Sequence, residues 1–190
     1  MHYIINQFLS GGGNIKSTKI FNLLVTFKGH KNETVGVELL GIEEIELALQ
    51  NGDPVYIEET EFINVVLVRV ANDPLDAAMK LMDTQTTVIS KIVPINEVVR
   101  TRPDYIVEKV IMLSGEKTNP KESFVVRCDL RGRKYIKSGE ELIDTVSEEI
   151  VEKLNLKLNE KNPDWVVQIE VVGEDTGVSV LRPGEIFKKI

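Results

Sequence analysis

A chain of 190 residues, 42% of them apolar and 28% charged, has the composition of an ordinary globular protein and can bury a real core. Its longest apolar run, Phe62–Val70, is interrupted by Asn64 and Arg69, so no membrane-spanning helix is expected, and residues 1–6 lack the basic start of a secretory signal. A single cysteine excludes an internal disulfide framework and favours a reducing, cytoplasmic compartment.

The formal net charge of −7 argues against a protein coated in basic charge for nucleic acid, and no DNA partner is expected. The charge is uneven, however, because residues 121–140 hold six Lys or Arg against three Asp or Glu, whereas the windows before and after them are negative. Salt screens charges beyond about 8–10 Å, so a local basic patch can attract phosphate even on an acidic protein. The alternative interpretation of this window is a solvated lysine-rich loop.

Residues 1–19 are expected to be a flexible N-terminal segment. The stretch Ser10–Thr18 is rich in glycine, and its Lys16-Ser17-Thr18 superficially resembles the end of a phosphate-binding P-loop. That loop needs glycine directly before the lysine, but Ile15 stands there, and a strand pattern follows where a helix is required. A mobile linker is therefore the expectation.

Residues 20–95 carry the first group of predicted elements. In chain order, the patterns predict a strand at 20–28, a helix at 32–50, a hairpin of strands at 54–59 and 62–70, a short helix after Asp73-Pro74 and a strand at 86–93. Asn32 is expected to cap the first helix, and Asn51-Gly52 to end it. This order is that of a ferredoxin-like domain (βαββαβ), with both helices on one face of an antiparallel sheet.

Each of these helices is expected to bury one apolar stripe. The predicted stripes are Val35, Leu39, Ile42, Ile45 and Leu49 in the first helix, and Leu75, Ala78, Met79 and Met82 in the second. The other face of the first helix is acidic, with Glu38, Glu43, Glu44 and Glu46. That face is either a docking surface for a basic partner or a merely solvated surface.

Residues 96–190 are expected to form a second, α/β domain, which makes the whole chain α+β. A helix begins at Pro103 and runs to about Ser114, with Ile106, Val110, Ile111 and Leu113 in its stripe. A strand at 124–131 turns Phe124, Val126, Cys128 and Leu130 to one face and Val125, Arg127, Asp129 and Arg131 to the other. Ser138 and Glu141 have capping-box spacing at the start of a helix that reaches about Asn155 and buries Leu142, Val146, Ile150 and Leu154. Strands at 165–172 and 178–181 complete the domain.

No catalytic constellation is evident, so no catalytic residue, metal or cofactor is expected. The two histidines, His2 and His30, are far apart in sequence, and Cys128 lies on the predicted buried face of its strand. A free cysteine in such a place usually behaves as a small apolar residue. No glycine-rich dinucleotide fingerprint follows a strand, and no metal-ligand cluster has useful spacing.

The strongest functional signal is the basic segment from Val126 to Ser138. Arg127 and Arg131 leave one face of the strand, and a loop with further cations leads to a helix N-terminus, where backbone N–H donors also favour phosphate. The candidate RNA-binding residues are Arg127, Arg131, Arg133, Lys134, Tyr135, Lys137 and Ser138. Arg131, Arg133 and Lys134 are expected to project from the strand end or loop without supporting the core, and Tyr135 offers a ring on which a base can stack.

Residues 124–138, the amphipathic helix after them, and the segments Asn162–Val171 and Gly177–Val180 together resemble a THUMP domain. This domain occurs in tRNA-modifying proteins such as 4-thiouridine synthetases, tRNA methyltransferases and the adaptor of tRNA cytidine acetyltransferase, where a ferredoxin-like domain commonly precedes it. The resemblance covers about residues 20–182, and Lys91–Val98 is similar to a segment of the adaptor branch. We therefore expect a flexible segment at 1–19, a ferredoxin-like domain at 20–95 and a THUMP domain at 96–190, whose start can also be placed near 75.

The resemblance implies tRNA binding through the single-stranded CCA end. Arg127, Arg131, Lys134 and Ser138 match the family's basic, polar pattern, whereas Arg133 and Lys137 are added on grounds of charge. These 190 residues contain no ATP-pyrophosphatase loop and no methyltransferase glycine motif. The resemblance thus favours a cytoplasmic adaptor, not an enzyme, that presents tRNA to a separate tRNA cytidine acetyltransferase. The alternatives are a recognition subunit of another tRNA modification enzyme, for methylation or thiolation, and an interaction module without RNA.

Overall fold

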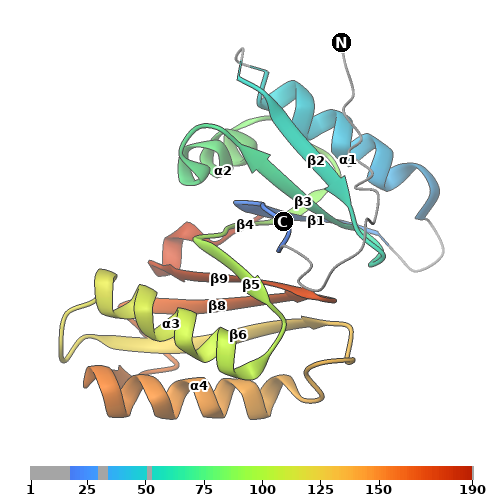
Figure 1. Cartoon of the computed structure of the whole chain (residues 1–190). Helices are drawn as coiled ribbons and strands as arrows, with labels where there is room; N and C mark the ends of the chain where they lie inside the picture. Colours follow the sequence, from blue (N-terminus) through green and yellow to red (C-terminus); the bar gives the residue numbers. More distant parts are fainter. Residues whose placement is uncertain (1–17, 30–33, 51–52, 190) are drawn as a thin grey trace.

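The computed structural model describes residues 18–29, 34–50 and 53–189. Its first sheet is built from the strands and helices of the N-terminal half, and Figure 1 shows both helices on the same side of it. The elements are β1 (Leu23–Phe27), α1 (Thr34–Ala48), β2 (Val55–Glu59), β3 (Val65–Val70), α2 (Pro74–Asp83) and β4 (Ile89–Pro94). All neighbouring strands are antiparallel, in the order β4-β1-β3-β2. The predicted βαββαβ order is confirmed.

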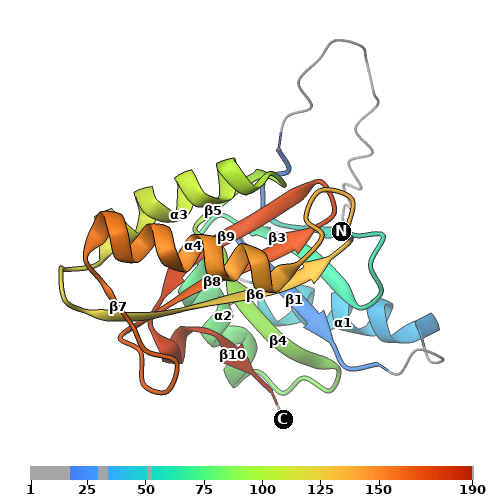
Figure 2. The ribbon, with the colours of Figure 1, turned by 90° about the horizontal axis from the view of Figure 1, so that it is seen from below.

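The second sheet belongs to the C-terminal half and is mixed. Its elements are β5 (Glu97–Arg100), α3 (Pro103–Lys117), β6 (Ser123–Arg131), α4 (Gly139–Leu154), β7 (Lys157–Leu158), β8 (Trp165–Val172) and β9 (Asp175–Leu181). The strand order is β5-β9-β8-β6-β7, with β6 parallel to both of its neighbours. Figure 2 shows α3 and α4 side by side along this sheet. The α+β fold class is confirmed, whereas β5 and β7 were not predicted.

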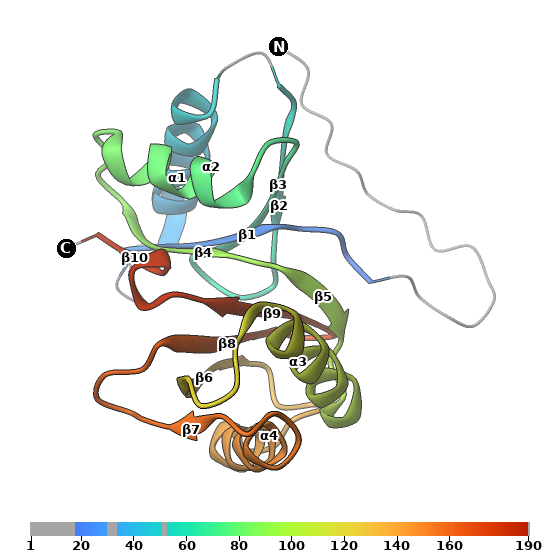
Figure 3. The same ribbon diagram turned by 90° about the vertical axis from the view of Figure 1, so that its left-hand side faces the viewer.

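The two sheets pack face to face, so that the molecule has helices on both outsides (Figure 3). An apolar cluster fills the space between the sheets, with members from both halves of the chain: Phe21, Leu24, Val65, Leu67, Val93, Ile95, Val172 and Leu181. After β9, a short 3₁₀ turn (Pro183–Glu185) leads to β10 (Phe187–Lys188), which pairs with β4 of the first sheet. The end of the chain therefore closes back onto the first half.

Local signals at the helix starts behave as predicted. The carboxylate of Asp73 accepts hydrogen bonds from the backbone N–H of Leu75 (2.8 Å) and Asp76 (3.2 Å), and Pro74 is the first residue of α2. The hydroxyl of Ser138 accepts from the N–H of Glu141 at 3.2 Å and so caps α4. Such caps typically contribute about 1 kcal/mol each. The expected caps of α1, Asn32 and Asn51-Gly52, lie outside the described residues.

Two of the predicted stripes are wrong in part. Leu39 is 61% exposed, whereas α1 turns Gly41 and Ile45 toward the core, and Leu49 is buried directly after the helix. Gly41 lies directly against the ring of Phe27, which leaves no room for a side chain. In α2 the buried residues are Ala77, Ala78 and Leu81, while Met79 is exposed. In both helices small residues mark the face that approaches the sheet, which a search for large apolar residues overlooks. No helix in the described part of the chain is long and apolar enough to cross a membrane.

Candidate nucleic-acid interface

The basic segment lies at one end of the second sheet, where two helices begin. Strands β5 and β6 run in the same direction, and the register aligns Arg100, Asp175, Val172 and Arg131 in one row across four strands. Immediately beyond this row, α3 starts at Pro103 and α4 at Gly139. The partly positive N-terminal ends of both helices thus lie at the same end of the second sheet.

The loop between β6 and α4 is anchored at its ends and presents its cations between them. Gly132 has φ +85°, and a side chain there would meet the ring of Phe62 at 3.1 Å. Ile136 is buried in the core of the second half, and Ser138 caps α4. Arg133, Lys134, Tyr135 and Lys137 are exposed. A loop held in this way can offer charges in a fixed arrangement, which favours phosphate binding.

Arg131 occupies a different environment from the one expected. Its side chain is only 16% exposed, and its guanidinium donates to Glu170 Oε2 at 2.6 Å. Lys91, from β4 of the first sheet, contacts Glu170 Oε1 at 2.7 Å and also pairs with Asp129. The expectation that Arg131 projects without supporting the core is wrong. Its role in RNA binding stays a prediction, and the structure makes it part of an ion cluster between the sheets.

Burial dominates the electrostatics of this ion cluster. Glu170 is completely buried, and desolvation raises its pKa despite the charges of Arg131 and Lys91. Burial also pushes the pKa of Asp129 upward, but the hydrogen bond and charge of Lys91 outweigh it, so the pKa lies below its usual value. Gln168 donates to Glu170 Oε1 at 2.9 Å. The Glu170 carboxylate therefore has three partners, Arg131, Lys91 and Gln168.

The two remaining predicted residues, Arg127 and Ser138, have different surroundings. Arg127 is exposed on the same face of β6 as Arg131 but four residues earlier, which is about 13 Å along a strand. The hydroxyl of Ser138 is used as the cap of α4, whose first turn holds Glu140 and Glu141. These carboxylates partly neutralise the positive end of the helix. The structure thus brings Arg133, Lys134, Tyr135 and Lys137 together and leaves Arg127 apart from them.

Tyr135 and Lys134 form one unit of this surface. The Lys134 ammonium lies 5.1 Å from the centre of the Tyr135 ring, and the tyrosine hydroxyl donates to Glu174 at 3.2 Å. The interaction with Tyr135, helped by the charges of Glu174 and Glu61, raises the pKa of Lys134. Lys134 therefore stays protonated beside an exposed ring.

A second such unit, which was not predicted from the sequence, lies at the start of α3. The guanidinium of Arg102 lies 5.0 Å from the centre of the Tyr105 ring and 3.9 Å from Asp104, and both Arg102 and Tyr105 are exposed. The only signal for it was Pro103, which marks the helix start. Because β5 was not predicted, the start of α3 could not be placed beside the start of α4 from the sequence alone.

The remaining chemical candidates do not form a catalytic site. Cys128 is half-buried against the core, and burial together with Asp129 and Glu170 raises its pKa to about 11, so the thiol is protonated at neutral pH. Lys16, Ser17, His2 and His30 lie outside the described residues. Among residues 18–29, 34–50 and 53–189, no group of His, Cys, Asp and Glu side chains is placed to hold a metal ion.

Comparison with known proteins places this surface in a named domain. Residues 100–181 match the family model of the THUMP domain. The chain therefore contains a THUMP domain, and the predicted resemblance is confirmed for these residues. No curated protein matches the chain.

Three solved structures share the fold over most of this chain. PH1313 from Pyrococcus horikoshii Ot3 is 18% identical over 86% of this chain and 55% of its own, with a TM-score of 0.69. A 4-thiouridine synthetase in complex with RNA and bound ATP is 16% identical over 86% of this chain and 42% of its own, with a TM-score of 0.61. TrmN from Thermus thermophilus is 19% identical over 85% of this chain and 46% of its own, with a TM-score of 0.55. The chain thus spans about half the length of these proteins.

Proposed function

We propose that this protein is a tRNA-binding adaptor that presents tRNA, through its CCA end, to a separate tRNA cytidine acetyltransferase. The observation that carries the proposal is the gathering of exposed cations and two exposed tyrosines where α3 and α4 begin in the THUMP domain. The resemblance to THUMP domains implies tRNA as the ligand, and the likeness to a synthetase bound to RNA is consistent with it.

The exposed side chains of this surface suit a single-stranded end better than a duplex. Unstacked bases can lie on exposed aromatic rings, and Tyr105 and Tyr135 each stand beside a cation. Arg133 and Lys137 lie next to Tyr135 in sequence and are free to contact the phosphates that connect such bases. The net charge of −7 limits this attraction to the local surface and argues for moderate affinity with strong salt dependence.

An adaptor that leaves the chemistry to a partner also fits the described residues. The thiol of Cys128 is protonated and half-buried, so it is a poor nucleophile. The carboxylates of the ion cluster are occupied by Arg131, Lys91 and Gln168. We propose that acetyl transfer to cytidine uses groups supplied by another protein and that this chain is not itself an enzyme.

A second candidate function is recognition of tRNA for another modification enzyme. The 4-thiouridine synthetase and a predicted N6-adenine-specific DNA methylase from Listeria monocytogenes share this fold, and we keep thiolation and methylation as the alternative partner reactions to be tested. The latter is 16% identical, with a TM-score of 0.52, over 84% of this chain and 40% of its own. Both alternatives keep the same RNA surface and differ only in the partner.

Two measurements separate these possibilities. Gel shifts compare total tRNA with the same tRNA trimmed of its CCA end. We expect at least about tenfold weaker binding after trimming, because tenfold already corresponds to the loss of a single stacked base. Equal affinity for both would refute the CCA end as target, and no shift at all would leave an interaction module without RNA.

The reaction of the partner enzyme is identified from the tRNA of cells that lack this protein. Mass spectrometry of their tRNA nucleosides should show loss of acetylated cytidine with thiolated and methylated nucleosides unchanged. Loss of a thiolated or methylated nucleoside instead would assign the protein to the corresponding enzyme.

A further inference from the structure

The second sheet has an edge that is mostly unpaired within the described residues. Strand β7 pairs with β6 only at Ser123 and Phe124, through Lys157 and Leu158. The backbone N–H of Lys157 donates to Glu122 O at 2.9 Å, and that of Asn159 donates to Phe124 O at 2.8 Å. Beyond Phe124, in the described part of the chain, no strand is paired with this side of β6.

The direction of each backbone group follows from the alternation of the strand. Residues 122 and 124 turn their polar groups to β7, whereas Ser123 O and Arg131 O accept from the side of β8. Successive residues point to opposite sides, so the N–H and C=O groups of Val126, Cys128 and Leu130 face the open edge. Such a row is a template for a further strand.

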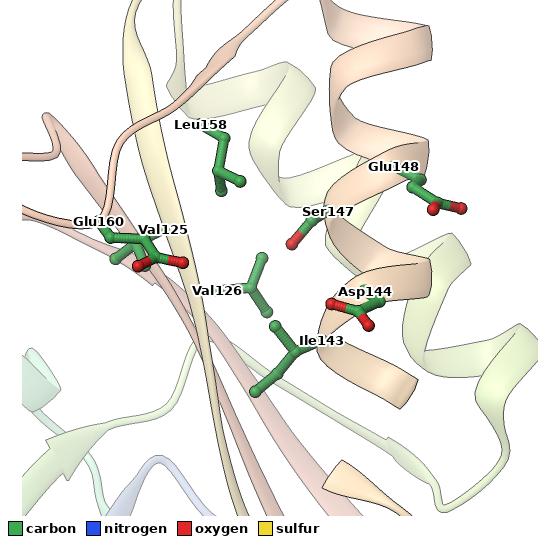
Figure 4. Close-up of a pocket in the computed structure, with 8 residues that line it drawn as sticks. All are labelled: Val125, Val126, Ile143, Asp144, Ser147, Glu148, Leu158 and Glu160. Carbon is green, nitrogen blue, oxygen red and sulfur yellow. The ribbon is translucent and has the colours of Figure 1, made fainter. Parts of the chain in front are cut away.

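A pocket opens beside the start of this edge, between α4, β6 and β7 (Figure 4). Its wall is apolar where Val125, Val126, Ile143 and Leu158 line it, and Leu158 is 53% exposed. Ser147 is only 9% exposed, and its hydroxyl points into the pocket toward Val126 and Leu158. The pocket therefore offers apolar contact together with one hydroxyl group.

The rim of the pocket is acidic. Figure 4 shows Asp144 from α4 and Glu160 after β7 turning their carboxylates toward the opening, and Glu148 also belongs to the lining. The lining contains no Lys or Arg. Phosphate would be repelled here, whereas a cationic side chain would be attracted. The charge of this pocket rim is thus opposite to that of the loop after β6.

From these observations we infer a protein-docking site: β6 accepts an added strand from a partner protein, an extended segment in which apolar residues alternate with Lys or Arg. Its backbone pairs with Val126, Cys128 and Leu130 and thereby gives affinity without regard to sequence. An apolar side chain enters the pocket over Val126 and Leu158, and the neighbouring cations meet Asp144 and Glu160, which gives specificity. This inference does not depend on the proposed RNA function.

The test begins with a phage-displayed library of random 12-residue peptides selected against the full chain. The enriched peptides are expected to combine apolar residues in alternation with Lys or Arg. A synthetic copy of one of them should slow amide hydrogen exchange of Val126, Cys128 and Leu130 in NMR spectra. N-methylation of the peptide at alternate positions should weaken binding about tenfold or more in the register that faces β6, because hydrogen bonds are lost, and little in the other register.

Charge reversal supplies the matched comparison. The double variant Asp144→Lys with Glu160→Lys should bind the peptide about tenfold more weakly. Glu116→Lys with Glu152→Lys makes the same change in net charge on exposed helix positions outside the pocket lining and should bind normally. Circular dichroism checks that both double variants fold. If one of them does not fold, the N-methylated peptides still test the site on the unchanged protein.

Several results would overturn the inference. One is failure of the library to enrich any peptide on the full chain, and another is protection of amides elsewhere by the enriched peptides. Equal weakening by both double variants would indicate unspecific charge attraction. A concentration-dependent dimer that protects the same amides without peptide would place a second copy of this chain, rather than a partner, on β6.

Discussion

Replacement of Arg131 by Met removes one cation from the ion cluster while keeping most of the side chain's volume. Glu170 is completely buried, and Arg131 contacts its Oε2 at 2.6 Å, so the variant leaves that oxygen without its charged partner. Breaking a buried ion pair from one side typically costs 3–5 kcal/mol. Because Lys91 still contacts the other oxygen at 2.7 Å, we expect about 3 kcal/mol, the low end of this range.

Urea unfolding, followed by circular dichroism, measures this loss. With a slope of about 2–3 kcal/mol per molar urea for a chain of this size, the midpoint should fall by about 1 M. Arg133→Met is the control, because Arg133 is exposed, and it should change stability by less than about 0.5 kcal/mol. Adding Glu170→Gln to Arg131→Met removes the unpaired charge and should recover part of the lost stability.

The pH dependence gives an independent check. Burial already raises the pKa of Glu170 in the folded protein, and loss of Arg131 raises it further. A carboxyl whose pKa is raised on folding favours the folded state when protonated, and this contribution is lost as the pH rises through its folded pKa. The deficit of Arg131→Met should therefore be largest at neutral and alkaline pH and shrink toward pH 4.5, the ordinary value for Glu. An Arg131→Met variant whose stability lies within about 0.5 kcal/mol of the parent at neutral pH would contradict a supporting role of Arg131 in the ion cluster.

Three further predictions follow from the site and its surroundings. Replacing the exposed loop cations Arg133, Lys134 and Lys137 with alanine should weaken tRNA binding. The slope of log affinity against log salt should become shallower by about 2, or roughly 0.7 per lost phosphate contact. Alanine replacement of the distant lysines Lys153, Lys157 and Lys161 is the control and should do much less. An unchanged salt slope in the loop variant would place the RNA elsewhere. The purified chain, incubated with acetyl donor, ATP and tRNA, should leave cytidine unmodified by mass spectrometry, and product formed by it alone would contradict an adaptor. The hydrogen bonds from Asn119 N–H and the Trp165 indole lower the pKa of Glu122, so its contribution to stability is present above about pH 4.5 and lost as the pH falls below it; Glu122→Gln should flatten the acid dependence seen by Trp165 fluorescence, and an unaltered acid limb would count against this contact.

The elements could be predicted because their signals are local. The capping of α4 by Ser138 and the proline at the start of α3 are read from a few neighbouring residues, and both are confirmed. The alternation along β6 likewise placed Phe124 and Val126 in the core correctly. The short strands β5, β7 and β10 carry no such signal, because pairing across the fold rather than local pattern determines them.

The same distinction explains the partial prediction of the site. The loop cations were found because they are close together in sequence, whereas Arg102 and Tyr105 join them only through the parallel course of β5 and β6. Arg131 looked like its neighbours in the sequence, since a basic residue at a strand end gives no sign of a buried carboxylate on the next strand. Glu170 is 39 residues away from it along the chain. Exposed cations of the candidate RNA surface and cations that hold the fold together could not be separated without the tertiary structure.

The ion cluster also determines where the candidate RNA surface lies relative to the first half of the protein. Lys91 enters it from β4, and Phe62, from the turn between β2 and β3, packs against Gly132 and Gly173 at the base of the basic loop. The glycines have φ of +85° and +60°, so another residue there would be strained as well as crowded. The loop is thus held between the two sheets by contacts to both halves of the chain. A loop anchored in this way keeps its backbone in place without the support of bound RNA, which lowers the entropic cost of binding.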